Sequence, residues 1–300
     1  MEHKEIYGAI KKQKQFLENI GYNVLYIGLF GSQNYKLDNE NSDIDLRAII
    51  MPTLEQVIKR DTISIKYETE IGDIDVKDVM TYYNVVRKGN FSFIEPMQTI
   101  WFIGDKKLRE MFGEIRLNYM SLKGDMYSKA EAFRHPYPSK EKEISQWGYD
   151  PKQLHHIFRL IDLLQTKNDK VSFIEYDEKN AQFLKDVKIN KNNIIQNLSH
   201  IDITSIDKIK EYIDFVCGKY IDKDYKYQPI DIKDNVVKYI ENHLKKMIFK
   251  SPIQSAREQR TFNNGIPKDD LKKFPELKKY INKDICYIVY ESLEILWLQP

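Results

Sequence analysis

Residues 24–50 read VLYIGLFGSQNYKLDNENSDIDLRAII, and this stretch decides the fold that the sequence predicts. An apolar run rich in β-forming residues stops at Gly31 and Ser32, which predicts a buried strand that ends in a turn. After ten mostly polar residues, the chain resumes with the alternating pattern of a second strand from Asp43 onward. Because side chains on a strand alternate between its two faces, Asp43 and Asp45 share one face with Arg47.

Two carboxylates side by side on a strand repel each other, and a bound divalent cation explains such a pair best. Hard oxygen ligands favour Mg²⁺ or Mn²⁺ over zinc. Gly31 and Ser32 allow the backbone to approach a ligand closely, so that N–H groups and a hydroxyl could hold phosphate oxygens. The stretch therefore predicts a site for a metal-bound triphosphate, although an Asp-x-Asp pair on an exposed strand can also be a solvated edge.

The pattern of Gly-Ser, about ten residues and Asp-x-Asp resembles the signature of the DNA polymerase beta nucleotidyltransferase superfamily. More closely, GSQNY followed by SDIDLR is similar to bacterial and phage predicted nucleotidyltransferases, which carry GSxxYG followed by SDxDxR. Lys36 stands where that pattern has its second glycine. The resemblance implies two Mg²⁺ ions, or Mn²⁺, and a nucleoside triphosphate held by Gly31, Ser32, Tyr35, Ser42 and Arg47.

A polymerase-type site also requires a third carboxylate on a neighbouring strand, for the second metal or for activating the attacking hydroxyl. Residues 63–67 and 73–76 are predicted strands, and Asp73 and Asp75 share a face of the second one. Strand geometry alone does not choose between the two. The resemblance favours Asp73, measured back from Lys88-Gly89-Asn90, which matches the KGN at the family's helix end. Glu95 follows, either to orient a ligand or as a helix-start carboxylate.

A second informative stretch, GYDPKQLHHIFRL at residues 148–160, predicts a helix that begins at Asp150. Lys152, His156 and Arg159 recur at spacings of four and three and therefore share one helix face, suited to phosphate or base binding. The stretch resembles the family's G-Y-D-x-K-x-x-x-H-x-x-R-L segment, in which these three residues occupy the matching positions. The alternative is an ordinary amphipathic helix with a solvated basic face.

The remaining pattern predicts an α+β protein. We expect a small mixed-sheet, polymerase-beta-like nucleotidyltransferase domain at residues 1–115 and a mainly helical domain at 116–300 that closes the active-site cleft. Predicted helices cover residues 2–20, 54–60, 79–86, 117–133, 206–220, 232–249 and 284–298, with a short strand at 171–176 and a loop at 251–267.

Composition limits the function less than the motifs do. Charged residues make up 31% of 300 and nearly cancel, at net +2, which gives no general argument for a nucleic-acid partner. The two cysteines, Cys217 and Cys286, lie far apart in no ligand spacing, so we expect a reduced, cytoplasmic protein without a structural zinc. No signal peptide, membrane anchor or membrane partner is predicted.

The sequence thus predicts an enzyme that transfers a nucleoside monophosphate from a nucleoside triphosphate to a hydroxyl, with release of pyrophosphate. The acceptor stays open between an RNA 3′ end, a small molecule and a protein hydroxyl, the last as in nucleotidylating, AMPylating antitoxins. A different class of function is a nucleotide-binding sensor or interaction protein without turnover. The pair of aspartates favours the enzyme, because a non-catalytic pocket has less need of both carboxylates.

Overall fold

The computed structural model describes residues 3–38, 42–135, 137–257, 262–263 and 266–267. The chain divides into two compact units, one of Met1–Met51 with Thr62–Asp234 and one of Pro52–Asp61 with Asn235–Pro300. The predicted boundary near residue 115 falls inside the first unit, after its sheet, and stays a prediction.

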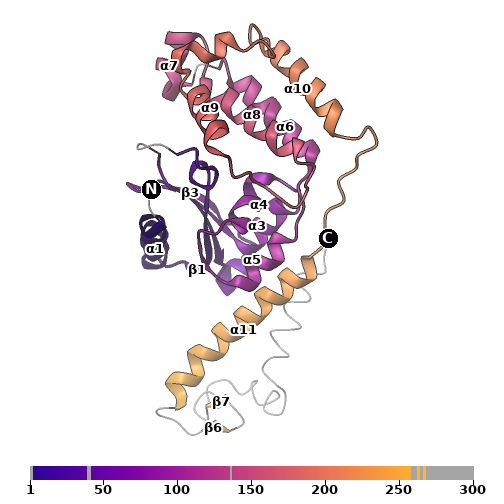
Figure 1. Ribbon diagram of the computed structural model, residues 1–300. Helices are drawn as coiled ribbons and strands as arrows, with labels where there is room; N and C mark the ends of the chain where they lie inside the picture. Colours follow the sequence, from indigo (N-terminus) through magenta and orange to yellow (C-terminus); the bar gives the residue numbers. More distant parts are fainter. Residues whose placement is uncertain (1–2, 39–41, 136, 258–261, 264–265, 268–300) are drawn as a thin grey trace. The chain divides into compact units, whose positions relative to one another are not determined.

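The first unit contains a five-stranded mixed sheet (Figure 1). Its strands are β1 (Asn23–Phe30), β2 (Asp45–Met51), β3 (Ser64–Glu68), β4 (Asp73–Asp78) and β5 (Phe102–Gly104), in the spatial order β3-β4-β2-β1-β5. β2 and β4 run parallel, while the other neighbours are antiparallel. The sheet with the helices around it confirms the predicted α+β class.

Alternation along the central strands separates an apolar face from the face that carries the site. Leu46, Ala48 and Ile50 of β2 belong to a buried cluster with Ile74 and Val76 of β4. Helix α1 (His3–Asn19) supplies its own apolar residues to this cluster, as its predicted helical pattern requires. The intervening residues of β2 and β4, which include all the predicted carboxylates except Asp43, therefore lie on the opposite face.

Helices α3 (Val79–Val86), α4 (Phe91–Gln98) and α5 (Lys106–Gly113) lie on the side of the sheet away from α1 (Figure 1). Gly28 of β1 allows α4 to come close, since a Cβ there would lie 2.7 Å from the Pro96 carbonyl oxygen. The neighbouring Tyr26 donates a hydrogen bond of 2.5 Å to the same oxygen. These contacts fix the helix that carries Glu95 against the edge where β1 ends.

The rest of the first unit is helical. It contains α6 (Tyr119–Ala132), α7 (Glu141–Trp147), α8 (Pro151–Gln165), α9 (Glu178–Lys188) and α10 (Ile206–Tyr220), together with the 3₁₀ segments η1 (Ser32–Tyr35), η2 (Pro138–Lys140) and η3 (Lys191–Asn197). Asp150, the predicted start of this helix, is the N-cap of α8, and its carboxylate accepts from the Lys152 N–H at 3.0 Å.

The predicted strand at 171–176 is wrong, because this segment pairs with no strand of the sheet. Side chains hold it instead. The Gln98 Oε1 accepts from both the Ser172 N–H and hydroxyl, each at 2.9 Å, and the Tyr176 hydroxyl donates to Asp162 at 2.9 Å. The β-forming residues of this segment therefore lie in an irregular stretch that side-chain hydrogen bonds fix.

The second unit contains α2 (Leu54–Lys59), most of α11 (Lys233–Arg257), and the short strands β6 (Phe262–Asn263) and β7 (Ile266–Pro267). The predicted loop at 251–267 is wrong over residues 251–257, where α11 continues through Pro252, and at residues 262–263 and 266–267, which form β6 and β7. The predicted helix at 284–298 and Cys286 lie outside the described residues.

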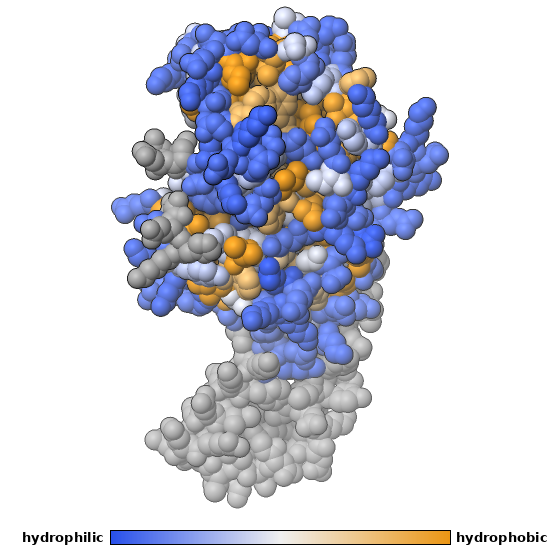
Figure 2. Space-filling model, in the orientation of Figure 1, coloured by the Kyte–Doolittle hydropathy of each residue, from blue (hydrophilic) through white to orange (hydrophobic). Residues whose placement is uncertain are grey.

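Hydrophilic side chains cover most of the described surface in the view of Figure 2, with hydrophobic residues in smaller patches. Within the described part of the chain, no helix has the length and apolar character needed to cross a bilayer.

Candidate active site

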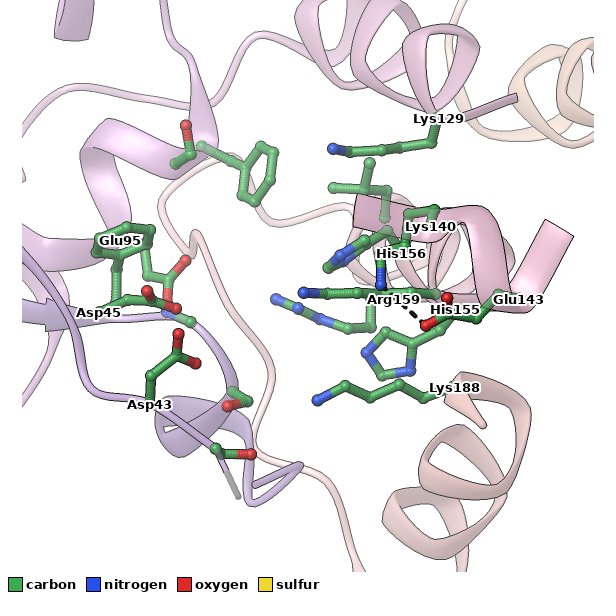
Figure 3. Close-up of a pocket in the computed structure, with 18 residues that line it drawn as sticks. Asp43, Asp45, Glu95, Lys129, Lys140, Glu143, His155, His156, Arg159 and Lys188 are labelled. Carbon is green, nitrogen blue, oxygen red and sulfur yellow. Dashed lines mark hydrogen bonds and ion pairs between the residues drawn. The ribbon is translucent and has the colours of Figure 1, made fainter. Parts of the chain in front are cut away.

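A cavity of about 670 Å³ lies in the first unit, bordered by the ends of β1 and β2, by α4, and by the helical region. Carboxylates gather on its sheet side and cationic side chains extend toward them from the helices (Figure 3). Its lining residues with charged or titratable side chains are Asp43, Asp45, Glu95, Lys129, Lys140, Glu143, Lys152, His155, His156, Arg159 and Lys188.

The acidic side is formed where β2 begins. Asp43 precedes the strand and Asp45 is its first residue, and both line the cavity as predicted. Burial, followed by the charges of Asp43 and Asp73, raises the pKa of Asp45 from 3.8 to about 6. Ionised Asp45 is therefore disfavoured by burial and by its acidic neighbours, and a bound divalent cation would relieve that repulsion.

These carboxylates fit a magnesium site of the kind completed by substrate. Within the described residues, no group of three or more His, Cys, Asp or Glu side chains converges on one point. Mg²⁺ commonly takes one or two protein carboxylates and completes its octahedron with phosphate oxygens and water. Asp43 and Asp45 would supply the two protein ligands that such an arrangement needs.

The two candidates for the third carboxylate have different surroundings. In the parallel register Leu46 pairs with Ile74, which places Asp45 and Asp73, one residue earlier in each strand, side by side. The Lys66 ammonium pairs with Asp73 at 2.6 Å. Asp75 is held between two cations, Arg47 at 3.0 Å and Lys77 at 2.9 Å. Neither carboxylate lines the cavity, and of the two Asp73 is the one whose charge reaches Asp45.

Arg47, a predicted nucleotide contact, is placed in the interior instead. Its guanidinium lies 4.5 Å from the ring centre of Phe30 and 3.9 Å from that of Phe93. Together with its ion pair to Asp75, these contacts leave Arg47 outside the residues that line the cavity. Its arrangement is that of a packed structural arginine.

The Gly31 turn approaches the acidic pair very closely. Gly31 has φ of 91°, and a Cβ on it would lie 2.9 Å from Asp45 Oδ2, so both conformation and space require glycine. The Gly31 N–H donates to Glu95 Oε1 at 2.8 Å. That amide is therefore engaged within the protein, and Ser32 is the member of the predicted pair that remains to face a ligand in the cavity.

Tyr35 and Lys36 complete this turn. The buried Tyr35 donates its hydroxyl proton to Glu95 Oε2 at 2.6 Å, and it does not line the cavity. Lys36 adopts the left-handed conformation, with φ of 58°. That conformation explains why the resembling pattern has glycine at this position, since glycine adopts it without steric cost. Ser42, the remaining predicted contact, lines the cavity.

The cationic side draws on several helices. Lys152 and Arg159 of α8 line the cavity as predicted, and they are joined by Lys129 of α6 and Lys188 of α9. Among the described residues, none of these four cations forms an ion pair within 4 Å. Burial and the neighbouring cations lower the pKa of Lys129 and of Lys188. Such mutual repulsion is relieved by a bound polyanion.

The two histidines of α8 contribute no charge to this wall. The His155 Nδ1–H donates to the Leu184 carbonyl oxygen at 2.9 Å, and burial lowers the pKa of His155 to about 3. Burial and the Arg159 charge lower the pKa of His156 well below 6.5. His156, predicted from its spacing to lie with Lys152 and Arg159, does line the cavity, but it is neutral at pH 7 in the ligand-free protein.

Sequence reasoning missed Lys129, Lys140, Glu143 and Lys188. Lys140 and Glu143, three residues apart on the same wall of the cavity, form an ion pair at 3.3 Å (Figure 3). Each of these residues is one of many charged residues in a polar helical segment, and no local motif distinguishes it. The packing of α6, α7 and α9 around α8 brings them to the site, and the sequence carries no signal for that packing.

Comparison with known proteins adds little to this geometry. No protein-family model matches the chain, and no curated protein matches it. Among solved structures, the chain is similar to a nucleotidyltransferase-like protein from Exiguobacterium sibiricum 255-15, with 12% identity over 96% of this chain and 92% of that one. The TM-score of 0.23 is too low for this likeness to carry an argument about fold or function.

Proposed function

We propose that the protein is a divalent-metal-dependent nucleotidyltransferase that transfers a nucleoside monophosphate from a nucleoside triphosphate to a hydroxyl acceptor. One observation carries the proposal. Two adjacent carboxylates, Asp43 and Asp45, face four cations without ion-pair partners among the described residues across a single cavity of about 670 Å³. Its volume is that of an ordinary small-molecule site, and its charge separation matches a metal ion bound to a triphosphate.

Asp43 and Asp45 would hold Mg²⁺ or Mn²⁺, which when bound neutralises phosphate charge and polarises the reacting phosphorus. Ser32 would donate to phosphate oxygens at the turn. The opposite wall would neutralise the charge that develops on the leaving pyrophosphate, through Lys129, Lys152, Arg159 and Lys188.

In the reaction, the acceptor oxygen would form a bond to the α-phosphorus while the bond from that phosphorus to the bridging oxygen breaks, so that pyrophosphate leaves. The acceptor hydroxyl would lose its proton to a carboxylate. We assign this role to Asp73, because it lies beside Asp45 and has one cationic partner, whereas Asp75 is held by two. Lys66 would then have to release Asp73 or share it with the acceptor.

The engagement of Asp75 and Asp73 by cations favours one other candidate, a nucleotide-binding protein without turnover. In that case the cavity would bind a metal–nucleotide complex, but no carboxylate would accept the proton of an incoming hydroxyl. Binding and transfer must therefore be measured separately.

The decisive experiment supplies each α-³²P-labelled nucleoside triphosphate and Mg²⁺ to the purified protein, with total RNA in one set and soluble extract in another. The double variant Asp43→Asn/Asp45→Asn tests the site, and the control, Glu110→Gln, changes an exposed carboxylate of α5 away from the cavity. Label moved by the parent and the control but not by the double variant supports the proposal. Whether RNA, protein or a small molecule becomes labelled identifies the acceptor. Metal-dependent binding without transfer would favour the non-catalytic alternative.

A further inference from the structure

Among the carboxylates that line the cavity, Glu95 of α4 is held by the most hydrogen bonds, more than Asp43 or Asp45. Its side chain is 2% exposed. Oε1 accepts from the Gly31 N–H at 2.8 Å and from Asn34 Nδ2 at 2.9 Å, and Oε2 accepts from the Tyr35 hydroxyl at 2.6 Å. All three donors belong to the same five-residue turn, which Glu95 therefore holds at three points.

This turn is the element that lies against Asp45. Because a Cβ at Gly31 would come within 2.9 Å of Asp45 Oδ2, the backbone of Gly31 limits where that carboxylate can lie. Asn34 extends the link, since its Oδ1 accepts from Thr99 at the end of α4 and its Nδ2 also donates to the Leu29 carbonyl of β1. Glu95 therefore fixes the position of Gly31, and Gly31 in turn limits where the Asp45 carboxylate can lie.

Glu95 also acts through its charge. Among the described residues, no Lys, Arg or His forms an ion pair with its carboxylate, which hydrogen bonds hold instead. Burial raises the pKa of Glu95, and the Arg159 charge and these hydrogen bonds oppose that rise. The nearest cationic influence is Arg159, whose guanidinium lies over the Tyr35 ring, 3.6 Å from its centre. When Glu95 is ionised, its negative charge acts on Asp45 and adds to the attraction for a divalent cation.

We propose that Glu95 is a positioning residue, which fixes the Gly31–Tyr35 turn against Asp45 and strengthens divalent-cation binding by the Asp43–Asp45 pair. The inference rests on the proposed function for the identity of the site. Loss of Glu95 would lower the affinity for the metal although Glu95 is not itself a metal ligand. Residues that hydrogen-bond to and orient a metal site commonly have this effect.

The experiment measures Mn²⁺ binding by electron paramagnetic resonance in the absence of nucleotide. Glu95→Gln keeps the shape of the side chain and its acceptor for Gly31 and Asn34, but removes the charge. We expect its Kd for Mn²⁺ to rise about 10-fold. The control is Glu110→Gln, the same change at an exposed position of α5 that does not line the cavity, and its Kd should stay within about twofold of the parent's. A parental Kd for Glu95→Gln would overturn the proposal.

Tyr35→Phe tests positioning, because it removes one hydrogen bond to Glu95 and leaves the carboxylate itself in place. In the transfer assay its kcat should fall about 10-fold with KM for the nucleotide nearly unchanged, as expected for a displaced reacting geometry. If Glu95→Gln does not fold, this variant decides, and a parental kcat overturns the proposal. A parent that neither binds Mn²⁺ nor transfers label would instead refute the proposed function, so the two failures are distinguishable.

Discussion

Replacing Asp45 by asparagine should stabilise the metal-free protein and abolish its response to divalent cations. The structure shows Asp45 half-buried beside Asp43 and Asp73, with its pKa raised from 3.8 to about 6. At about 1.4 kcal/mol per pKa unit, the folded state loses about 3 kcal/mol when this group ionises. Because the side chain is partly exposed, solvent screening reduces the expected gain to about 1–2 kcal/mol.

The pH dependence has a definite sign. A carboxyl whose pKa is higher in the folded state favours folding below pH 3.8, and this contribution is lost as the pH rises to about 6. The Asp45→Asn variant has no such loss. Its advantage over the parent should therefore be small near pH 4, increase between pH 4 and 6, and be complete at pH 7.5.

The assay is thermal unfolding in EDTA at pH 4 and pH 7.5, and again at pH 7.5 with Mg²⁺. We expect the variant to melt roughly 2–6 °C above the parent at pH 7.5 in EDTA. Mg²⁺ should raise the melting temperature of the parent and not that of the variant, because a ligand stabilises in proportion to its binding of the folded state. Glu110→Gln should behave like the parent throughout. An equal gain for Asp45→Asn at both pH values, or none at pH 7.5, would refute the electrostatic reasoning.

Three further predictions follow from the same geometry. Lys188→Met should raise KM for the nucleoside triphosphate about 10-fold, because it removes a cation from the cavity wall. The melting temperature should stay parental, since Lys188 has no ion-pair partner among the described residues. A parental KM would place the triphosphate elsewhere. Arg47→Met should lower the free energy of unfolding by about 3 kcal/mol in urea titrations, because Asp75 loses a buried partner, and a change in KM alone would contradict this structural role. Lys36→Gly should raise the free energy of unfolding by about 0.5–1 kcal/mol, because glycine relieves the left-handed backbone strain, and this gain outweighs the loss of an exposed ion pair with Glu175. A less stable variant would contradict this reasoning.

Several features of the site were predictable because they depend on local pattern. Strand alternation placed Asp43 and Asp45 at the start of β2, and the helical spacing of Lys152, His156 and Arg159 placed all three on one face of α8. The capping residue Asp150 and the glycine at position 31 were equally readable. These features depend on neighbours along the chain, and their geometry follows from the period of the strand or helix.

The same pattern reasoning could not assign partners. Arg47 lies in line with the two aspartates, yet its guanidinium packs between the rings of Phe30 and Phe93, and Phe93 comes from a helix far along the chain. Spacing left Asp73 and Asp75 equivalent, and they differ through the cations that the register of β2, β3 and β4 brings to each. A residue's partners depend on which surfaces come together, and that information is distributed over the whole chain.

The sequence by itself therefore determined the α+β class, the acidic pair and the basic face of α8, because strand and helix periods are properties of consecutive residues. The tertiary structure alone decided that Glu95 holds the Gly31 turn, that His156 is neutral, and that Lys129 and Lys188 complete the cationic wall. Each of these depends on burial and on charges from distant segments, and both arise when α4, α6 and α9 pack around the cavity.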